Sequence, residues 1–126
     1  MRLTPTHERI LIYLISLHSM IVGVMLLFFA EWAVKFAGWA GADPIFFIWQ
    51  AGAFHFVLAT GYLVEYGRSR TISLLLIAKT TAFVFLIGGS LITDTPWSVW
   101  FSGFADGAMA LVAYLVHRAV AKHSAE

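Results

Sequence analysis

Four long apolar segments make up most of the chain, and they limit how it can fold more than any other feature. They cover about residues 10–29, 45–66, 72–92 and 97–116. A helix needs about 20 apolar residues to cross the bilayer core, and within lipid a helix satisfies its own backbone hydrogen bonds. The sequence therefore predicts one integral membrane domain over residues 1–126, an all-α, up-and-down four-helix transmembrane bundle.

The composition agrees with a membrane location. Charged residues make up 12% of the chain and hydrophobic residues 60%, whereas a soluble domain carries about 25% charged residues. A formal net charge of +1 indicates no nucleic-acid-binding surface. Because the chain has no cysteine, disulfides, thiolate metal sites and thiol nucleophiles are excluded.

Local signals predict where the helices begin and end. A capping residue followed by proline favours a helix start, and this pair occurs at Thr4-Pro5, Asp43-Pro44 and Thr95-Pro96. Between the second and third spans, YGRSRT offers Gly67 to end one helix and Thr71 to cap the next. We therefore expect short connections and antiparallel neighbours.

Basic and aromatic residues predict the orientation. One end of the bundle, with both termini and the middle loop, carries Arg2, Arg9, Arg68, Arg70, Arg118 and Lys122. Only Lys35 lies in the loops at the other end. Since basic residues remain in the cytoplasm, both termini should be cytoplasmic, in a bacterial inner membrane. All five tryptophans fall toward the outer side and all four tyrosines toward the inner side, as in the aromatic belts of membrane proteins.

The outer loop AEWAVKFAGWAGADP contains a possible short helix. Trp32, Phe36 and Trp39 recur at three- and four-residue spacing, opposite Glu31 and Lys35. This pattern is compatible with a short interfacial helix after the first span, or with a loop that the tryptophans anchor.

Each predicted span contains one costly polar residue near its middle: His18, His55, Lys79 and Asp106. At about 1.5 Å per residue, they lie about 17, 15, 20 and 14 Å from the outer ends of their spans. Ionisable residues in a membrane face the bundle interior and pair with one another. The short TDTP turn makes the last two spans neighbours, so we expect Asp106 to neutralise Lys79. Glu65, at the inner end of the second span, is the rival partner if the lysine extends toward the cytoplasm.

Small residues predict close packing and a pocket. Gly103 and Gly107 are four residues apart, a spacing that brings helix backbones together, either within the bundle or at a dimer face. On the second span, Gly52, His55 and Tyr62 share one stripe, and we interpret Gly52 as leaving space beside the histidine.

The polar centre formed by His18, His55, Lys79 and Asp106 is compatible with several functions. The leading hypothesis is a non-catalytic accessory or assembly subunit of an inner-membrane complex, with the polar centre packing helices or binding a quinone or lipid together with Tyr62. An alternative is haem b held by His18 and His55. Another is a homodimeric proton-coupled transporter. The expected partners are the lipid bilayer and other membrane subunits or a second copy, and not nucleic acid.

Hydrolytic chemistry has no support in the sequence. The chain has no nucleophile-elbow motif and no H-E-x-x-H pattern, so we assign no catalytic residue. A metal site built from His18, His55 and Asp106 has no supporting local motif.

The overall layout resembles small four-helix membrane proteins of the DoxX-like group. The similarity covers the chain in outline and rests on VGVMLLFFAEW, then FAGWAGADP, then WQAGAFHFVLATGYL. Some DoxX-type proteins are linked to quinone-coupled sulfur oxidation. The resemblance therefore implies a quinone-related or accessory role, without assigning any site residue.

Overall fold

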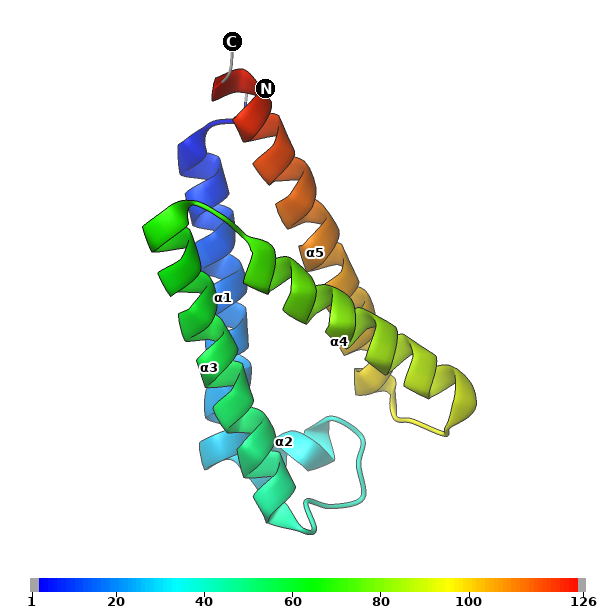
Figure 1. The fold of residues 1–126 in the computed structure, drawn as a ribbon. Helices are drawn as coiled ribbons and strands as arrows, with labels where there is room; N and C mark the ends of the chain where they lie inside the picture. The colour runs from blue at the N-terminus through cyan, green and yellow to red at the C-terminus, as the bar shows by residue number, and fades with distance from the viewer. Residues whose placement is uncertain (1–2, 125–126) are drawn as a thin grey trace.

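Five helices run through residues 3–124, the part of the chain that the computed structural model describes (Figure 1). They are α1 (Pro5–Phe28), α2 (Ala30–Phe36), α3 (Ile45–Ser69), α4 (Ser73–Ile92) and α5 (Trp97–Ser124). All but α2 are long and apolar enough to cross a membrane. The predicted four-helix bundle is confirmed, and the protein is a multi-pass membrane protein. Arg2, one of the residues used to predict orientation, lies outside the described residues.

The long helices extend beyond the apolar segments that predict them. Helix α1 begins at Pro5, α3 continues to Ser69 and α5 continues to Ser124. The length of an apolar segment reflects the thickness of the hydrocarbon core, whereas a helix can continue into the polar interface while its backbone hydrogen bonds are satisfied.

The signals for helix starts have mixed outcomes. Thr4 caps α1 as predicted: its hydroxyl accepts from the His7 backbone, and the His7 ring accepts from the Thr4 N–H. The expected Asp43 cap is wrong, because Pro44 itself occupies the N-cap position of α3 in an extended conformation. The Thr95 hydroxyl donates to Ser90 Oγ at 2.8 Å and so joins the end of α4 to the segment before α5.

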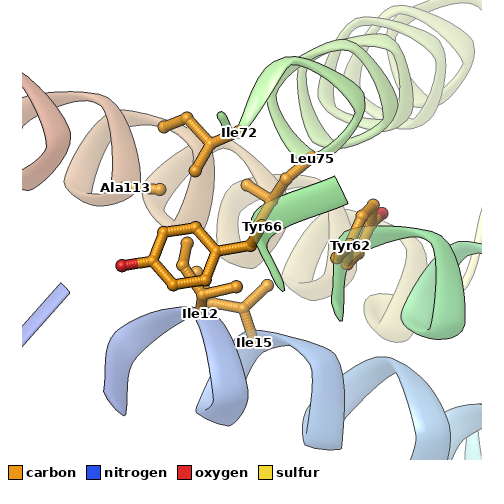
Figure 2. Packing of buried hydrophobic residues seen from close by; sticks show 7 residues of the cluster. All are labelled: Ile12, Ile15, Tyr62, Tyr66, Ile72, Leu75 and Ala113. Atoms are coloured by element: carbon orange, nitrogen blue, oxygen red, sulfur yellow. The ribbon is translucent and has the colours of Figure 1, made fainter. Parts of the chain in front are cut away.

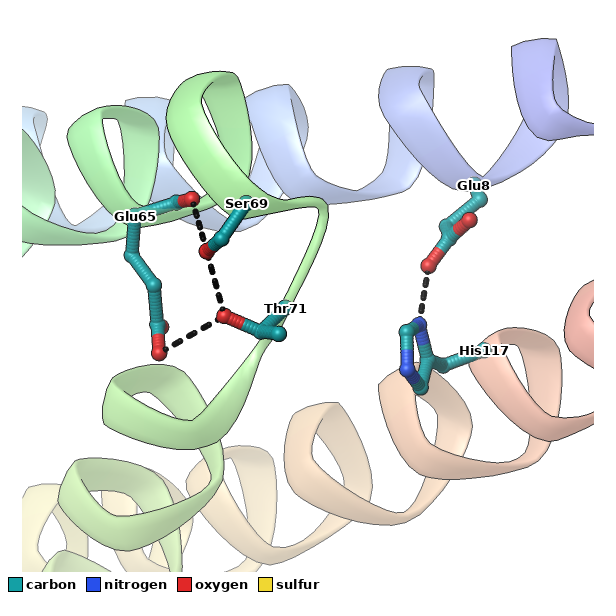
Figure 3. Close-up of polar contacts among 5 residues, drawn as sticks. All are labelled: Glu8, Glu65, Ser69, Thr71 and His117. Carbon is teal, nitrogen blue, oxygen red and sulfur yellow. Dashed lines mark hydrogen bonds and ion pairs between the residues drawn. The ribbon is translucent and has the colours of Figure 1, made fainter.

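The turn between α3 and α4 also differs from the prediction. Helix α3 passes through Gly67 and ends at Ser69, and the left-handed residue after it is Arg70, with φ 55°. Thr71 does not cap α4. Instead the Glu65 carboxylate accepts from the Thr71 hydroxyl at 3.1 Å (Figure 3). It also accepts from the Leu74 N–H at 2.9 Å. A carboxylate here satisfies free N–H groups and the positive end of the helix dipole.

The bundle is built from two antiparallel pairs, α1 with α3 and α4 with α5. Figure 1 shows the second pair leaning away from the first toward the end that carries α2. The start of α1 and the end of α5 lie at the opposite end, as an even number of spans requires. We call this the inner end, following the predicted orientation.

Glycines hold the helices of each pair together. A Cβ on Gly52 would lie 3.0 Å from the Gly23 carbonyl oxygen, so α1 and α3 are in backbone contact. The interpretation that Gly52 leaves open space is therefore wrong, since α1 fills it. A Cβ on Gly103 or Gly107 would lie 2.7 Å from the nearest side-chain atom of α4. Both glycines on α5 thus serve packing within the bundle.

The hydrophobic core joins the two pairs toward the inner end (Figure 2). It consists of Ile12, Ile15, Tyr62, Tyr66, Ile72, Leu75 and Ala113. Tyr62 and Tyr66 are each only 2% exposed, so their predicted place in an interfacial belt is wrong. A tyrosine ring is apolar enough for a core provided that its hydroxyl reaches a polar group or water.

Helix α2 confirms the predicted short helix at the outer end. Ala30 and Val34 are buried, whereas Trp32 and Phe36 are exposed and stack with ring centroids 5.1 Å apart. The aromatic side of α2 is therefore free to contact the membrane interface.

The segment around α2 also contacts the second helix pair. Phe36 meets Trp97 edge-on, with ring centroids 5.9 Å apart. Gly38 has φ +92°, and a Cβ there would lie 2.9 Å from the Pro96 side chain. The two pairs are thus connected by the core toward the inner end and by this aromatic contact at the outer end.

Candidate functional site

Lys79 and Asp106 form an ion pair inside the bundle, as predicted. Lys79 Nζ donates to Asp106 Oδ1 at 2.6 Å, and the two residues are 3% and 9% exposed. Charges so poorly exposed are tolerated only when they are paired. Lys79 belongs to α4 and Asp106 to α5, so the pair is internal to one helix pair.

The glycines of α5 explain how a short carboxylate reaches the lysine. Side chains lean toward the N-terminus of their helix, which tilts Lys79 and Asp106 in opposite directions along antiparallel helices. Gly103 and Gly107 flank Asp106 and let α5 approach α4 closely. The flexible lysine stem then spans the remaining separation.

Glu65 is not the partner of Lys79. One of its carboxylate oxygens accepts from the Thr71 hydroxyl (Figure 3), and the other accepts from the Leu74 N–H in the first turn of α4. The rival ion pair in the sequence analysis is therefore excluded.

His18 and His55 lie on the other helix pair, α1 and α3. The five predicted site residues therefore come from all four spans, with Tyr62 also on α3. They differ in exposure: Tyr62, Lys79 and Asp106 are buried, His55 is half-buried and His18 is exposed.

His55 has unused hydrogen-bonding capacity. Its Nδ1 atom is buried and makes no hydrogen bond among the described residues. Buried polar atoms are nearly always paired, because leaving one unpaired costs about 1–3 kcal/mol. Lys79 also keeps two N–H donors beyond the one that Asp106 accepts. The polar centre therefore combines a neutralised charge pair with one buried imidazole nitrogen that has no partner among the described residues.

The helix packing does not fit haem b between His18 and His55. Bis-histidine ligation places a porphyrin between two helices, with one imidazole on each face of the ring. A Cβ on Gly23 of α1 would lie 3.3 Å from His55 Cβ and 3.0 Å from the Gly52 carbonyl oxygen of α3. Helices in such contact leave no gap for a macrocycle. Within residues 3–124 no three metal-ligating side chains come together either.

A second polar cluster at the inner end was not singled out from the sequence. The Glu8 carboxylate of α1 contacts His117 Nδ1 of α5 at 2.5 Å (Figure 3). Glu8 is only 5% exposed, and Tyr66 and Arg70 line the same pocket as Glu8 and His117. The one signal in the sequence was a carboxylate in the first turn of an apolar helix.

Comparison with known proteins identifies no relative of this chain. No family model, no curated protein and no solved structure matches the chain. The resemblance to DoxX-like proteins therefore stays an expectation from the sequence, and the functional argument rests on the site itself.

Proposed function

We propose that this membrane protein binds the polar head of a quinone, or of a lipid with similar carbonyl groups, at its polar centre. In this role it is a non-catalytic accessory subunit that holds the ligand for a larger inner-membrane complex. The observation that carries the proposal is the buried Nδ1 of His55, which has no partner among the described residues, in a bundle that also buries the Lys79–Asp106 pair. A ligand with hydrogen-bonding groups would satisfy this atom.

The chemistry of the site suits a ligand with two carbonyl oxygens. Lys79 has two N–H donors to spare, and each imidazole donates one N–H in its neutral form. Lys79 lies on α4, whereas His18 and His55 lie on α1 and α3. The two helix pairs would thus each supply a donor, one for each carbonyl group of a quinone.

The position of the site suits a ligand that arrives through the lipid. His18 is exposed, and many large apolar side chains of α1 and α3 face outward around the same level, including Leu14, Leu17, Ile21 and Phe54. An isoprenoid or acyl tail would lie against such surfaces. A site in the membrane interior therefore matches a hydrophobic ligand better than a water-soluble one.

Transport receives less support from the geometry. Transport sites are often formed by helices that are interrupted near the middle of the membrane. All four spans of this chain are continuous, and α4 runs through Gly88 and Gly89 without a break.

The test is a titration of the purified protein in mild detergent with a short-chain benzoquinone. Quenching of tryptophan fluorescence reports the binding. We expect His55→Leu to weaken binding about tenfold, as for the loss of one hydrogen bond. The same substitution should not lower the stability, because the Nδ1 atom has no partner to lose. Thr60→Val, at an exposed position on the same helix, is the matched control and should bind normally. Equal binding by His55→Leu and the wild type would refute the proposal.

A further inference from the structure

The inner end of the bundle contains a pocket separate from the polar centre. Its volume is about 490 Å³, and it lies between the start of α1, the end of α3 and the end of α5. Its charged walls are Glu8, Arg9, Arg70 and His117, and Tyr66 also lines it. The remaining wall is partly apolar, with Val120 and Ala121 from α5. Such a wall suits an amphiphilic ligand better than a fully hydrated ion.

The charges of this pocket favour an anion. Glu8 is already paired with His117. Within residues 3–124 neither Arg9 nor Arg70 has a carboxylate partner. Two guanidinium groups therefore remain, and their planar donor arrays suit phosphate oxygens.

The backbone of Arg70 is a further sign that its side chain is needed. The residue follows α3 in the left-handed conformation, with φ 55°, where glycine is the usual residue and other residues are strained. Its guanidinium carbon lies 5.1 Å from the centroid of the Tyr66 ring. Arg70 thus adopts a backbone conformation that is unfavourable for arginine, and its guanidinium group lies over the Tyr66 ring at the pocket.

We propose that this inner pocket binds a phosphate group, with the guanidinium groups of Arg9 and Arg70 as its ligands. The partly apolar wall and the location at the headgroup level favour the phosphate of an anionic phospholipid. Free phosphate from solution presents the same chemistry, and the experiment separates the two sources. This inference does not depend on the ligand proposed for the polar centre.

The experiment is native mass spectrometry of the full chain in mild detergent with added dioleoyl phosphatidylglycerol, and separately with phosphatidylcholine. We expect one phosphatidylglycerol molecule to bind more tightly than phosphatidylcholine. Arg70→Gly should weaken this binding at least about tenfold, as for the loss of a charge-assisted hydrogen bond. Since glycine suits a positive φ, this variant should fold normally.

Arg68→Gln is the matched control. Arg68 lies in the last turn of α3, two residues before Arg70, but does not line the pocket, so this variant should bind like the wild type. Equal binding of the two lipids, or equal loss in Arg68→Gln and Arg70→Gly, would overturn the proposal. Displacement of phosphatidylglycerol by millimolar inorganic phosphate, in the wild type only, would support the phosphate site and assign its ligand to solution.

Discussion

Replacing Asp106 by asparagine removes the negative charge next to Lys79 and leaves nearly everything else in place. Asparagine has the same shape and keeps an oxygen that can accept a hydrogen bond from Lys79. The lysine, only 3% exposed, would then be a buried cation without a counter-charge. The substitution thus tests how far the bundle depends on neutralising this charge.

The expected loss of stability follows from the geometry. At the 2.6 Å separation of the pair, with an effective dielectric constant of about 20, the Coulomb attraction is about 6 kcal/mol. Movement of the flexible lysine toward the interface hydrates its ammonium group and offsets part of this loss. Breaking a buried ion pair costs about 3–5 kcal/mol, and we expect Asp106→Asn to lose that amount of unfolding free energy.

The assay is reversible unfolding of the purified protein by SDS in mild-detergent micelles. Far-UV circular dichroism reports the loss of helix. Lys79→Met/Asp106→Asn buries no unpaired charge, so it should recover most of the stability that Asp106→Asn loses. Asp94→Asn, in the exposed turn before α5, makes the same chemical change outside the bundle and should have little effect. A loss below about 1 kcal/mol for Asp106→Asn, or no recovery in the double variant, would refute this reasoning.

Two further predictions concern helix packing and capping. Gly52→Ala should lower the unfolding free energy by about 1–3 kcal/mol, because its Cβ would lie 3.0 Å from the Gly23 carbonyl oxygen. Gly88→Ala on α4 has no atom within 4 Å of the new Cβ. It should be neutral or stabilising by up to about 1 kcal/mol in the same SDS assay. Equal effects of Gly52→Ala and Gly88→Ala on the unfolding free energy would contradict the packing described. Glu65→Gln should cost about 1 kcal/mol by weakening the cap on Leu74, with faster hydrogen exchange confined to the first turn of α4; unchanged exchange there would show that this cap contributes nothing.

The spans and the central ion pair could be predicted because their causes are local or nearly so. Twenty apolar residues in a row predict a membrane helix whatever surrounds them. The short turn before α5 makes α4 and α5 neighbours. A lysine and an aspartate about one helical turn apart in depth on neighbouring helices then have few partners besides each other.

Other features could not be predicted because they depend on how the helices approach one another. Glu8 and His117 are 109 positions apart in the sequence, and no local pattern links them. Tyrosine is a residue type typical of the membrane interface, yet Tyr66 is buried where the two helix pairs meet. The sequence does not show whether Gly52 leaves an open space or allows a neighbouring helix to pack against it. In the structure the backbone of Gly23 on α1 fills that space.

The most direct test of the ligand site is native mass spectrometry of the protein extracted in mild detergent from its own membrane. The wild type should retain the mass of a quinone or of a carbonyl-bearing lipid, alone or within a larger complex. His55→Leu should lose that mass while keeping its fold. A wild type without any added mass, or equal retention by His55→Leu, would contradict the proposal that the polar centre between the helix pairs binds a ligand.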